Sequence, residues 1–224
     1  MNRSPPDGDM AMVEALPSLQ RLALAYCPRR AKETTLALFA LDARLAGLVR
    51  SSREPMLAQL RLAWWREILS QPVDSWPAGE PVLARLKTWR GRSEALVGLA
   101  DGWEAMTAPA LDRHAVDALA DARGATFRAL AGLVGQERDA EPAFCMGRAW
   151  ALADIAARLS RPGEVDMARA LLTEQDWRGA RLSRAMRPLV VLHGLAARSA
   201  RRNGLDEAQP AAILTAMRLG LLGF

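Results

Sequence analysis

The spacing of leucines in the first quarter of the chain constrains its fold more than any other feature. They recur at intervals of three and four residues, at Leu38, Leu41, Leu45 and Leu48. This spacing places the side chains on one face of an α-helix. The pattern predicts a helix over residues 30–51.

The rest of the chain continues with helical periodicity, and alternation of apolar and polar residues typical of a strand is absent. The further expected helices are Met56–Ser70, Val82–Trp89, Ser93–Met106, Val116–Val134, Glu141–Leu159, Glu164–Leu172, Glu174–Arg202 and Ala211–Leu222. The sequence therefore predicts a single all-α helical bundle over residues 10–224, with about eight to ten helices. Residues 1–9 are expected to form a disordered N-terminus.

The expected helix Met56–Ser70 carries apolar residues on more than one side. One face holds Leu57, Leu60, Trp64 and Ile68, and another holds Leu62, Trp65 and Leu69. A helix with this pattern is expected to be largely buried. Because the two tryptophans are adjacent, one is expected to pack in the core and the other at its boundary.

Composition excludes several classes of protein. Half of the 224 residues are apolar and the net charge is only +5, which excludes intrinsic disorder. The two thiols, Cys27 and Cys145, suit a reducing compartment and do not form a disulfide framework or a cysteine zinc site. There is neither a membrane-spanning apolar run nor a signal-peptide pattern. We expect a cytoplasmic protein that at most rests on the inner face of a membrane.

The basic residues are almost all arginine. Of 30 lysines and arginines, only Lys32 and Lys87 are lysine, and the isoelectric point is about 10.1. Arginine offers a forked set of donors that suits phosphate and carboxylate. Basic chains of this kind bind nucleic acid, anionic lipid or phosphorylated molecules.

Common catalytic motifs are absent. The chain has no glycine-rich phosphate loop, no Gly-x-Ser-x-Gly elbow and no His-Glu-x-x-His helix. Its two histidines, His114 and His193, stand alone, and we expect each to have a structural or surface role.

One stretch resembles a known family. The segment LALFALDARLAGLV, followed by EPMLAQLRLAWWREIL, spans residues 36–69 and resembles the squalene/phytoene synthase family. The match around Trp64 and Trp65 is specific. Supporting matches are YCPRRAKETTLALF at residues 26–39 and LADGWEAM at residues 99–106. The resemblance covers about residues 15–200.

This resemblance implies an isoprenoid-synthase type of fold, with a central cavity between facing helices. Active members of the family carry two aspartate-rich motifs there, whose carboxylates hold Mg²⁺ against a diphosphate. Here Asp42 is present, but the positions of its partner aspartates hold Arg44, Leu45 and Leu48. On the second helix Asp154 is present and its partner is Arg158. Both pairs are lost, which implies no catalytic residue and no metal ligand.

The two remaining aspartates are expected to point inward. Asp42 shares a helix face with Leu38 and Leu45, and Arg61 shares one with Trp64. Buried charges need partners, so we expect Asp42 or Asp154 to pair with Arg61 or Arg158. Two interpretations stay open. The four residues are a remnant pocket for an anionic head group or lipid, or they are structural ion pairs, such as Asp154–Arg158 within one helix.

A second candidate surface is a block without any acid from residue 178 to residue 202. Its arginines are Arg178, Arg181, Arg184, Arg187, Arg198, Arg201 and Arg202. A basic amphipathic helix is typical of a membrane-surface or partner-docking element. The alternative is a solvated helix face. Nucleic acid is disfavoured as a partner, because zinc-finger, RNP and helix-turn-helix patterns are absent.

Two functions remain. The first is a catalytically degenerate family member without a cofactor, acting as a binding or assembly module at a membrane surface, as in the family's assembly factor for respiratory complex I. Its ligand would be an isoprenoid or lipid, and its partner an anionic membrane or protein. The alternative is a Mg²⁺-dependent prenyl-diphosphate synthase, a head-to-head prenyltransferase of isoprenoid biosynthesis.

Overall fold

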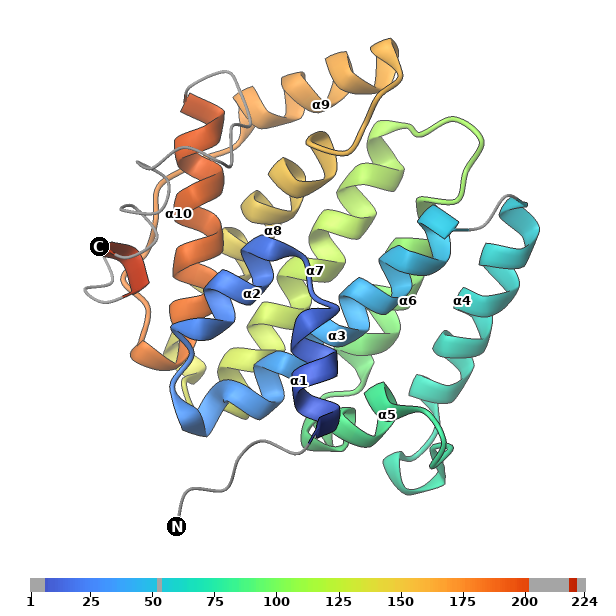
Figure 1. The fold of residues 1–224 in the computed structure, drawn as a ribbon. Coiled ribbons are helices and arrows are strands. Elements are labelled where there is room, and N and C mark those ends of the chain that lie inside the picture. The colour runs from blue at the N-terminus through green and yellow to red at the C-terminus, as the bar shows by residue number, and fades with distance from the viewer. Residues whose placement is uncertain (1–6, 52–53, 202–217, 221–224) are drawn as a thin grey trace.

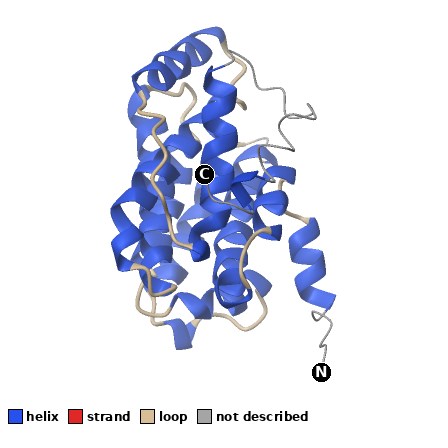
Figure 2. Ribbon diagram, turned by 90° about the vertical axis from the view of Figure 1, so that its left-hand side faces the viewer, coloured by secondary structure: helices blue, strands red, loops and turns tan. Residues whose placement is uncertain are grey.

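The computed structural model describes residues 7–51, 54–201 and 218–220, and within these residues it is helical without a strand (Figures 1 and 2). Its α-helices are α1 (Asp7–Glu14), α2 (Ser18–Ala25), α3 (Arg29–Ser51), α4 (Pro55–Ser70), α5 (Pro81–Leu86), α6 (Glu94–Ala105), α7 (Arg113–Leu133), α8 (Ala140–Ala156), α9 (Pro162–Glu174) and α10 (Arg187–Arg201). Short 3-10 helices lie at Val73–Ser75, Lys87–Trp89, Glu137–Asp139 and Arg184–Met186. The prediction of an all-α single-domain bundle is confirmed.

Helix α7 lies in the middle of the bundle. It packs against α6 and α8 along much of its length and also contacts α3. Helix α4 covers the outer side of α6, and α10 packs against α8 and α2 at the opposite edge of the molecule (Figure 1). The faces of α3, α7 and α8 that meet at this centre are therefore the most enclosed part of the fold.

Glycines allow α7 and α8 to approach closely. A Cβ atom on Gly124 would lie 2.9 Å from the Phe144 carbonyl oxygen, and one on Gly147 would lie 2.7 Å from the Phe127 ring. Both distances are too short for a real side chain. The Phe127 ring packs edge-on against the Trp150 ring, with centroids 5.8 Å apart. Arg123 precedes Gly124, so the close approach of the two helices also brings Arg123 next to α8.

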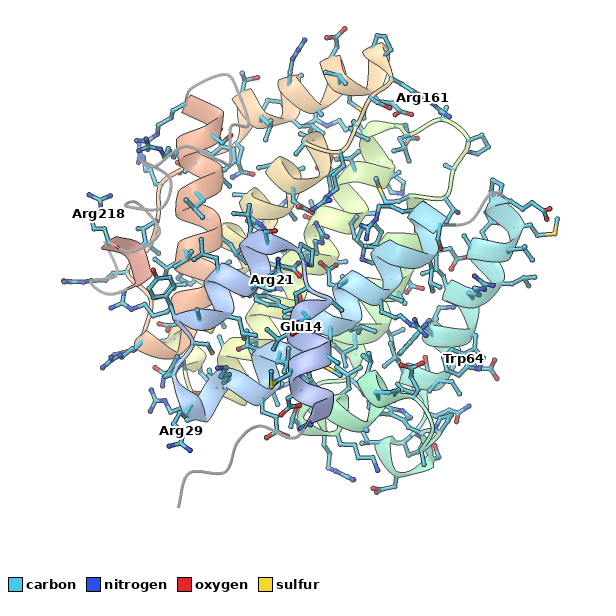
Figure 3. The ribbon with its side chains drawn as sticks, viewed as in Figure 1. Glu14, Arg21, Arg29, Trp64, Arg161 and Arg218 are labelled. Carbon is cyan, nitrogen blue, oxygen red and sulfur yellow. The ribbon has the colours of Figure 1, made fainter. Side chains whose placement is uncertain are left out.

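Most of helix α4 is exposed, so the prediction that it is largely buried is wrong. Its buried face consists of Ala58, Leu62, Trp65 and Leu69. The side chains of Leu57, Leu60 and Trp64 are 46, 62 and 41% exposed, and Trp64 lies at the edge of the molecule (Figure 3). The reason is that α4 has neighbours on one side only, so one of its two apolar faces stays uncovered. Of the two adjacent tryptophans, Trp65 is buried in the core as expected, whereas Trp64 is exposed.

The predicted helix Glu174–Arg202 is also wrong in its first part. Residues 175–183 form a loop, and α10 begins only at Arg187. Pro188 explains the break, because a proline lacks the backbone N–H and clashes with the preceding turn, yet fits the first turn of a new helix. At the N-terminus, residues 7–9 belong to α1 and not to a disordered segment.

Some expectations lie outside the described residues. These are the state of residues 1–6, the side chain of Arg202 and most of the expected helix Ala211–Leu222, of which residues 218–220 are described and helical. Within the described residues, helices of the length and apolarity needed to cross a membrane are absent.

Candidate functional site

The centre of the bundle holds a buried arginine, Arg123 on α7, whose side chain is 4% exposed. Its Nε and Nη2 atoms donate to the two carboxylate oxygens of Asp42 on α3, at 3.0 and 2.9 Å. Its Nη1 atom donates to Asp154 on α8, at 2.9 Å. One guanidinium therefore joins two carboxylates from facing helices.

The Asp42 carboxylate is fully hydrogen-bonded. Besides the two Arg123 donors, it accepts the indole N–H of Trp103 at 2.9 Å and the side-chain amide of Gln20 at 3.2 Å. Two oxygens have room for about four such hydrogen bonds, so this carboxylate has no acceptor site left. Its charge is offset by the forked contact with Arg123, the strongest kind of arginine–carboxylate pair.

The Asp154 carboxylate forms the outer end of the cluster. Its second oxygen accepts the Nε and Nη2 atoms of Arg158, one turn further along α8, at 3.2 and 2.7 Å. Burial on its own would raise the pKa of the Asp154 carboxyl, but the charge of Arg123 and the hydrogen bond from Arg158 outweigh burial and lower that pKa. Asp154 is therefore held in its ionised form.

Two tryptophan rings enclose the Arg123 guanidinium. Its central carbon lies 5.0 Å from the ring centroid of Trp103 on α6 and 5.0 Å from that of Trp150 on α8. Burial would lower the pKa of Arg123, but the charges of Asp42 and Asp154 raise it above its ordinary value. The guanidinium stays charged, and the rings around it keep water out and strengthen its ion pairs.

The structure brings together three of the four residues that the sequence analysis expected at this site. Asp42, Asp154 and Arg158 belong to one cluster, and the pair Asp154–Arg158 within one helix is present. Arg61 does not join them, because it lies on the exposed side of α4. The expectation that Arg61 points inward is therefore wrong, and the partner of Asp42 is Arg123.

A signal for Arg123 was present in the sequence. It recurs with Val116, Ala120 and Phe127 on the apolar face of α7, and all four side chains are buried. A charged residue at such a position has to find a partner inside the protein. The sequence does not say which acid provides it, because Asp42 and Asp154 lie 81 and 31 residues away.

The central residues do not fit the Mg²⁺ ions that the family resemblance implies. Such ions would lie between the helices that carry Asp42 and Asp154, and this is where the positive charge of Arg123 lies. Each oxygen of the two carboxylates already accepts a hydrogen bond from a guanidinium. Of the positions that lost an aspartate, Arg44 lies outside the cluster and pairs with Glu80 at 3.3 Å. Among the described residues, His, Cys, Asp and Glu form no group of three suited to a metal ion.

The basic block at the end of the chain is not one amphipathic helix. Arg178 and Arg181 lie in the loop before α10, and Arg184 lies in the 3-10 helix between that loop and α10. All three are exposed. Arg201 is exposed at the end of α10, while Arg187 and Arg198 are half-buried. The block thus combines an exposed loop with one side of α10.

Comparisons with known proteins leave the family open. Protein-family models, curated proteins and solved structures give no match to this chain.

Proposed function

We propose that this chain is a non-catalytic helical protein of the isoprenoid-synthase type, similar to the squalene/phytoene synthase family, which acts as a binding or assembly module at an anionic membrane surface. The observation that carries this proposal is the position of Arg123 between Asp42 and Asp154. Under this proposal, Arg123 replaces the metal ions that the two acids would bind in an active member of such a family.

The chemistry of prenyl transfer supports this interpretation. A diphosphate leaving group carries several negative charges, and carboxylate-bound Mg²⁺ neutralises them. In this chain the carboxylates are neutralised by Arg123 instead, and the site is enclosed by Trp103 and Trp150. A metal ion would have to displace a buried guanidinium from two ion pairs, which costs several kcal/mol.

The basic block supports a membrane location. Arg178, Arg181, Arg184 and Arg201 are exposed, and an acid is absent from the sequence between residues 178 and 202. Each such side chain near an anionic leaflet contributes about 1 kcal/mol of binding. We therefore place the protein in the cytoplasm, peripheral at the inner face of the membrane.

An activity assay tests the loss of catalysis. The purified protein is incubated with farnesyl diphosphate or geranylgeranyl diphosphate and Mg²⁺, and released diphosphate is measured. We expect no release above that of a protein-free control. Turnover by the wild type that Asp154→Asn abolishes would overturn the non-catalytic proposal and favour a prenyl-diphosphate synthase.

Vesicle flotation tests the membrane location. The protein should float with vesicles that contain phosphatidylglycerol, remain unbound with phosphatidylcholine alone, and dissociate as salt is raised. The double variant Arg178→Gln/Arg184→Gln should bind about thirtyfold more weakly, since each arginine contributes about 1 kcal/mol. The control Arg50→Gln/Arg61→Gln removes the same charge from exposed positions on α3 and α4 and should bind like the wild type. Equal binding to neutral vesicles would contradict the proposal.

A further inference from the structure

The outward side of helix α4 exposes a strip of apolar side chains. Five large hydrophobic side chains are exposed in the described part of the chain, and four of them, Met56, Leu57, Leu60 and Trp64, lie on α4. Spacings of three and four residues join these four into one continuous strip along the helix, here called the α4 strip. A contiguous apolar patch of a few hundred Å² on a small domain is typical of an interaction surface.

The α4 strip has no cover within the described residues. Helix α4 packs against α6 and α3 with its opposite side, which includes Leu62 and Trp65. The strip itself lies at the edge of the molecule (Figures 1 and 3). The Trp64 ring packs edge-on against the Trp65 ring, with centroids 5.3 Å apart, so its position is restrained before any partner binds. An aromatic side chain that is already ordered loses little entropy on binding.

Two exposed charges lie along one flank of this strip. They are Glu54, which directly precedes α4, and Arg61. Seven residues make about two helical turns, so the two side chains lie on the same side of the helix, and about 10 Å of axial separation keeps them from pairing with each other. Within the described residues neither side chain forms a hydrogen bond or an ion pair, whereas Arg66 on the far side of α4 pairs with Asp101 and Glu104.

This arrangement of apolar and charged side chains is self-complementary. In an antiparallel pair of α4 helices related by a two-fold axis, each flank of one helix faces the same flank of the other. With the axis near Leu57, midway between Glu54 and Arg61, Glu54 of each copy lies opposite Arg61 of the other. The same ion pair then forms twice, once on each side of the axis. At the axis Leu57 meets its own copy, and Leu60 lies beside it.

We infer that the α4 strip is the contact between two copies of this chain, packed as an antiparallel two-fold pair. An anionic membrane fits this surface less well, because Glu54 and Glu67 are exposed beside the strip and amphipathic helices that bind such membranes carry basic side chains there. The strip lies at the edge of the molecule opposite α10 (Figure 1). The inference therefore goes beyond the proposed function and does not depend on it.

Sedimentation equilibrium tests the inference over protein concentrations from about 1 to 200 µM, the range in which a weak dimer dissociates. The molar mass should rise from that of one chain, 24.4 kDa, toward twice that value. Leu57→Asp and Leu60→Asp should each weaken the dimer by more than about tenfold, because they place a charge in an apolar contact. Both side chains are exposed in the single chain, so circular dichroism should show that both variants are folded. A dimer that survives both changes would overturn the inference.

A charge exchange tests the antiparallel arrangement. Arg61→Glu places two acids opposite each other on both sides of the axis and should weaken the dimer by at least about tenfold. The double variant Glu54→Arg/Arg61→Glu brings opposite charges together again and should restore the dimer to within about threefold of the wild type. Arg178→Glu makes the same charge change in the loop before α10 and should dimerise like the wild type. Failure of the double variant to restore the dimer would overturn the antiparallel pairing.

Other occupants of the α4 strip give different outcomes. A chain that stays monomeric at about 200 µM would overturn the inference. If that monomer also floats with vesicles and Leu60→Asp abolishes flotation, the strip is a membrane contact instead. Flotation at protein concentrations below the dissociation constant of the dimer keeps the test of the membrane location independent of this contact.

Discussion

Two regions of this molecule place arginine in opposite environments, one buried and one exposed. At the centre, the three donors of Arg123 are used by Asp42 and Asp154, and tryptophan rings close the space around it. Before α10, by contrast, Arg178, Arg181 and Arg184 are exposed at the surface. The first region is closed to ligands, while the second carries its arginines on the surface.

The difference follows from burial. A charged group inside the protein has lost its water and is stable only with partners of opposite charge, so Arg123 had to be matched. An arginine at the surface, such as Arg178 or Arg184, keeps its head group in water, so it is stable without a buried acid beside it. The number of arginines in a chain therefore says little about function, and what surrounds each of them says much more.

The largest effect is expected at the centre. Replacing Arg123 by methionine leaves the Asp42 carboxylate enclosed without a positive partner and leaves Asp154 with Arg158 alone, so the free energy of unfolding should fall by about 3–5 kcal/mol. Urea unfolding, followed by circular dichroism, measures it. The control is Arg128→Met, also on α7, which removes a surface pair with Glu141 and should cost less than about 1 kcal/mol. Similar losses of unfolding free energy for the two variants would show that the buried cluster stabilises the fold no more than a surface ion pair does.

The next largest effect is expected at His193. Its pKa is lowered from 6.5 in the unfolded chain to about 4 in the fold, so the unfolded state binds the proton more tightly. Above pH 6.5 the neutral ring costs nothing in either state. As the pH falls from 6.5 toward 4, the free energy of unfolding should decrease by about 3 kcal/mol in all. The difference in unfolding free energy between the wild type and His193→Gln should follow this curve. Parallel pH profiles would show that the ring is not held in its neutral form.

The smallest effect is expected at the rim of the central cluster. Arg158 is 45% exposed and pairs with Asp154 within one helix. Its replacement by glutamine should lower the free energy of unfolding by about 0.5–1 kcal/mol, because water screens a pair at this depth. Thermal unfolding at neutral pH is a sufficient measurement. A loss as large as that of Arg123→Met would show that Arg158 stabilises the cluster as much as Arg123 does, and would contradict this ranking.

Much of the fold could be predicted from the sequence. Helical spacing of apolar residues located α3, α7 and α8 closely, and it correctly placed Asp42 on an inward face. It failed at α4, where two apolar faces compete and only packing against α6 decides which one is buried. The same spacing also predicted one continuous helix through residues 175–186, although Pro188 marks the start of a new helix.

The candidate site was predictable only in part. Asp42 and Asp154 stood out from the family resemblance, but their shared partner Arg123 comes from a third helix. Pairing between helices depends on how they pack, which local periodicity does not encode. The exposure of Arg178 and Arg181 depends on the path of the loop at residues 175–183, and this path has no periodic signal.

The most direct measurement follows the side-chain Nε–H signals of the arginines by NMR while farnesyl diphosphate is added with Mg²⁺. This probe carries the diphosphate that an active member of such a family would bind together with Mg²⁺. We predict that Arg123 and Arg158 stay unchanged. A Mg²⁺-dependent shift of Arg123 would show that the centre opens to a metal-bound diphosphate, and would contradict a closed, non-catalytic core.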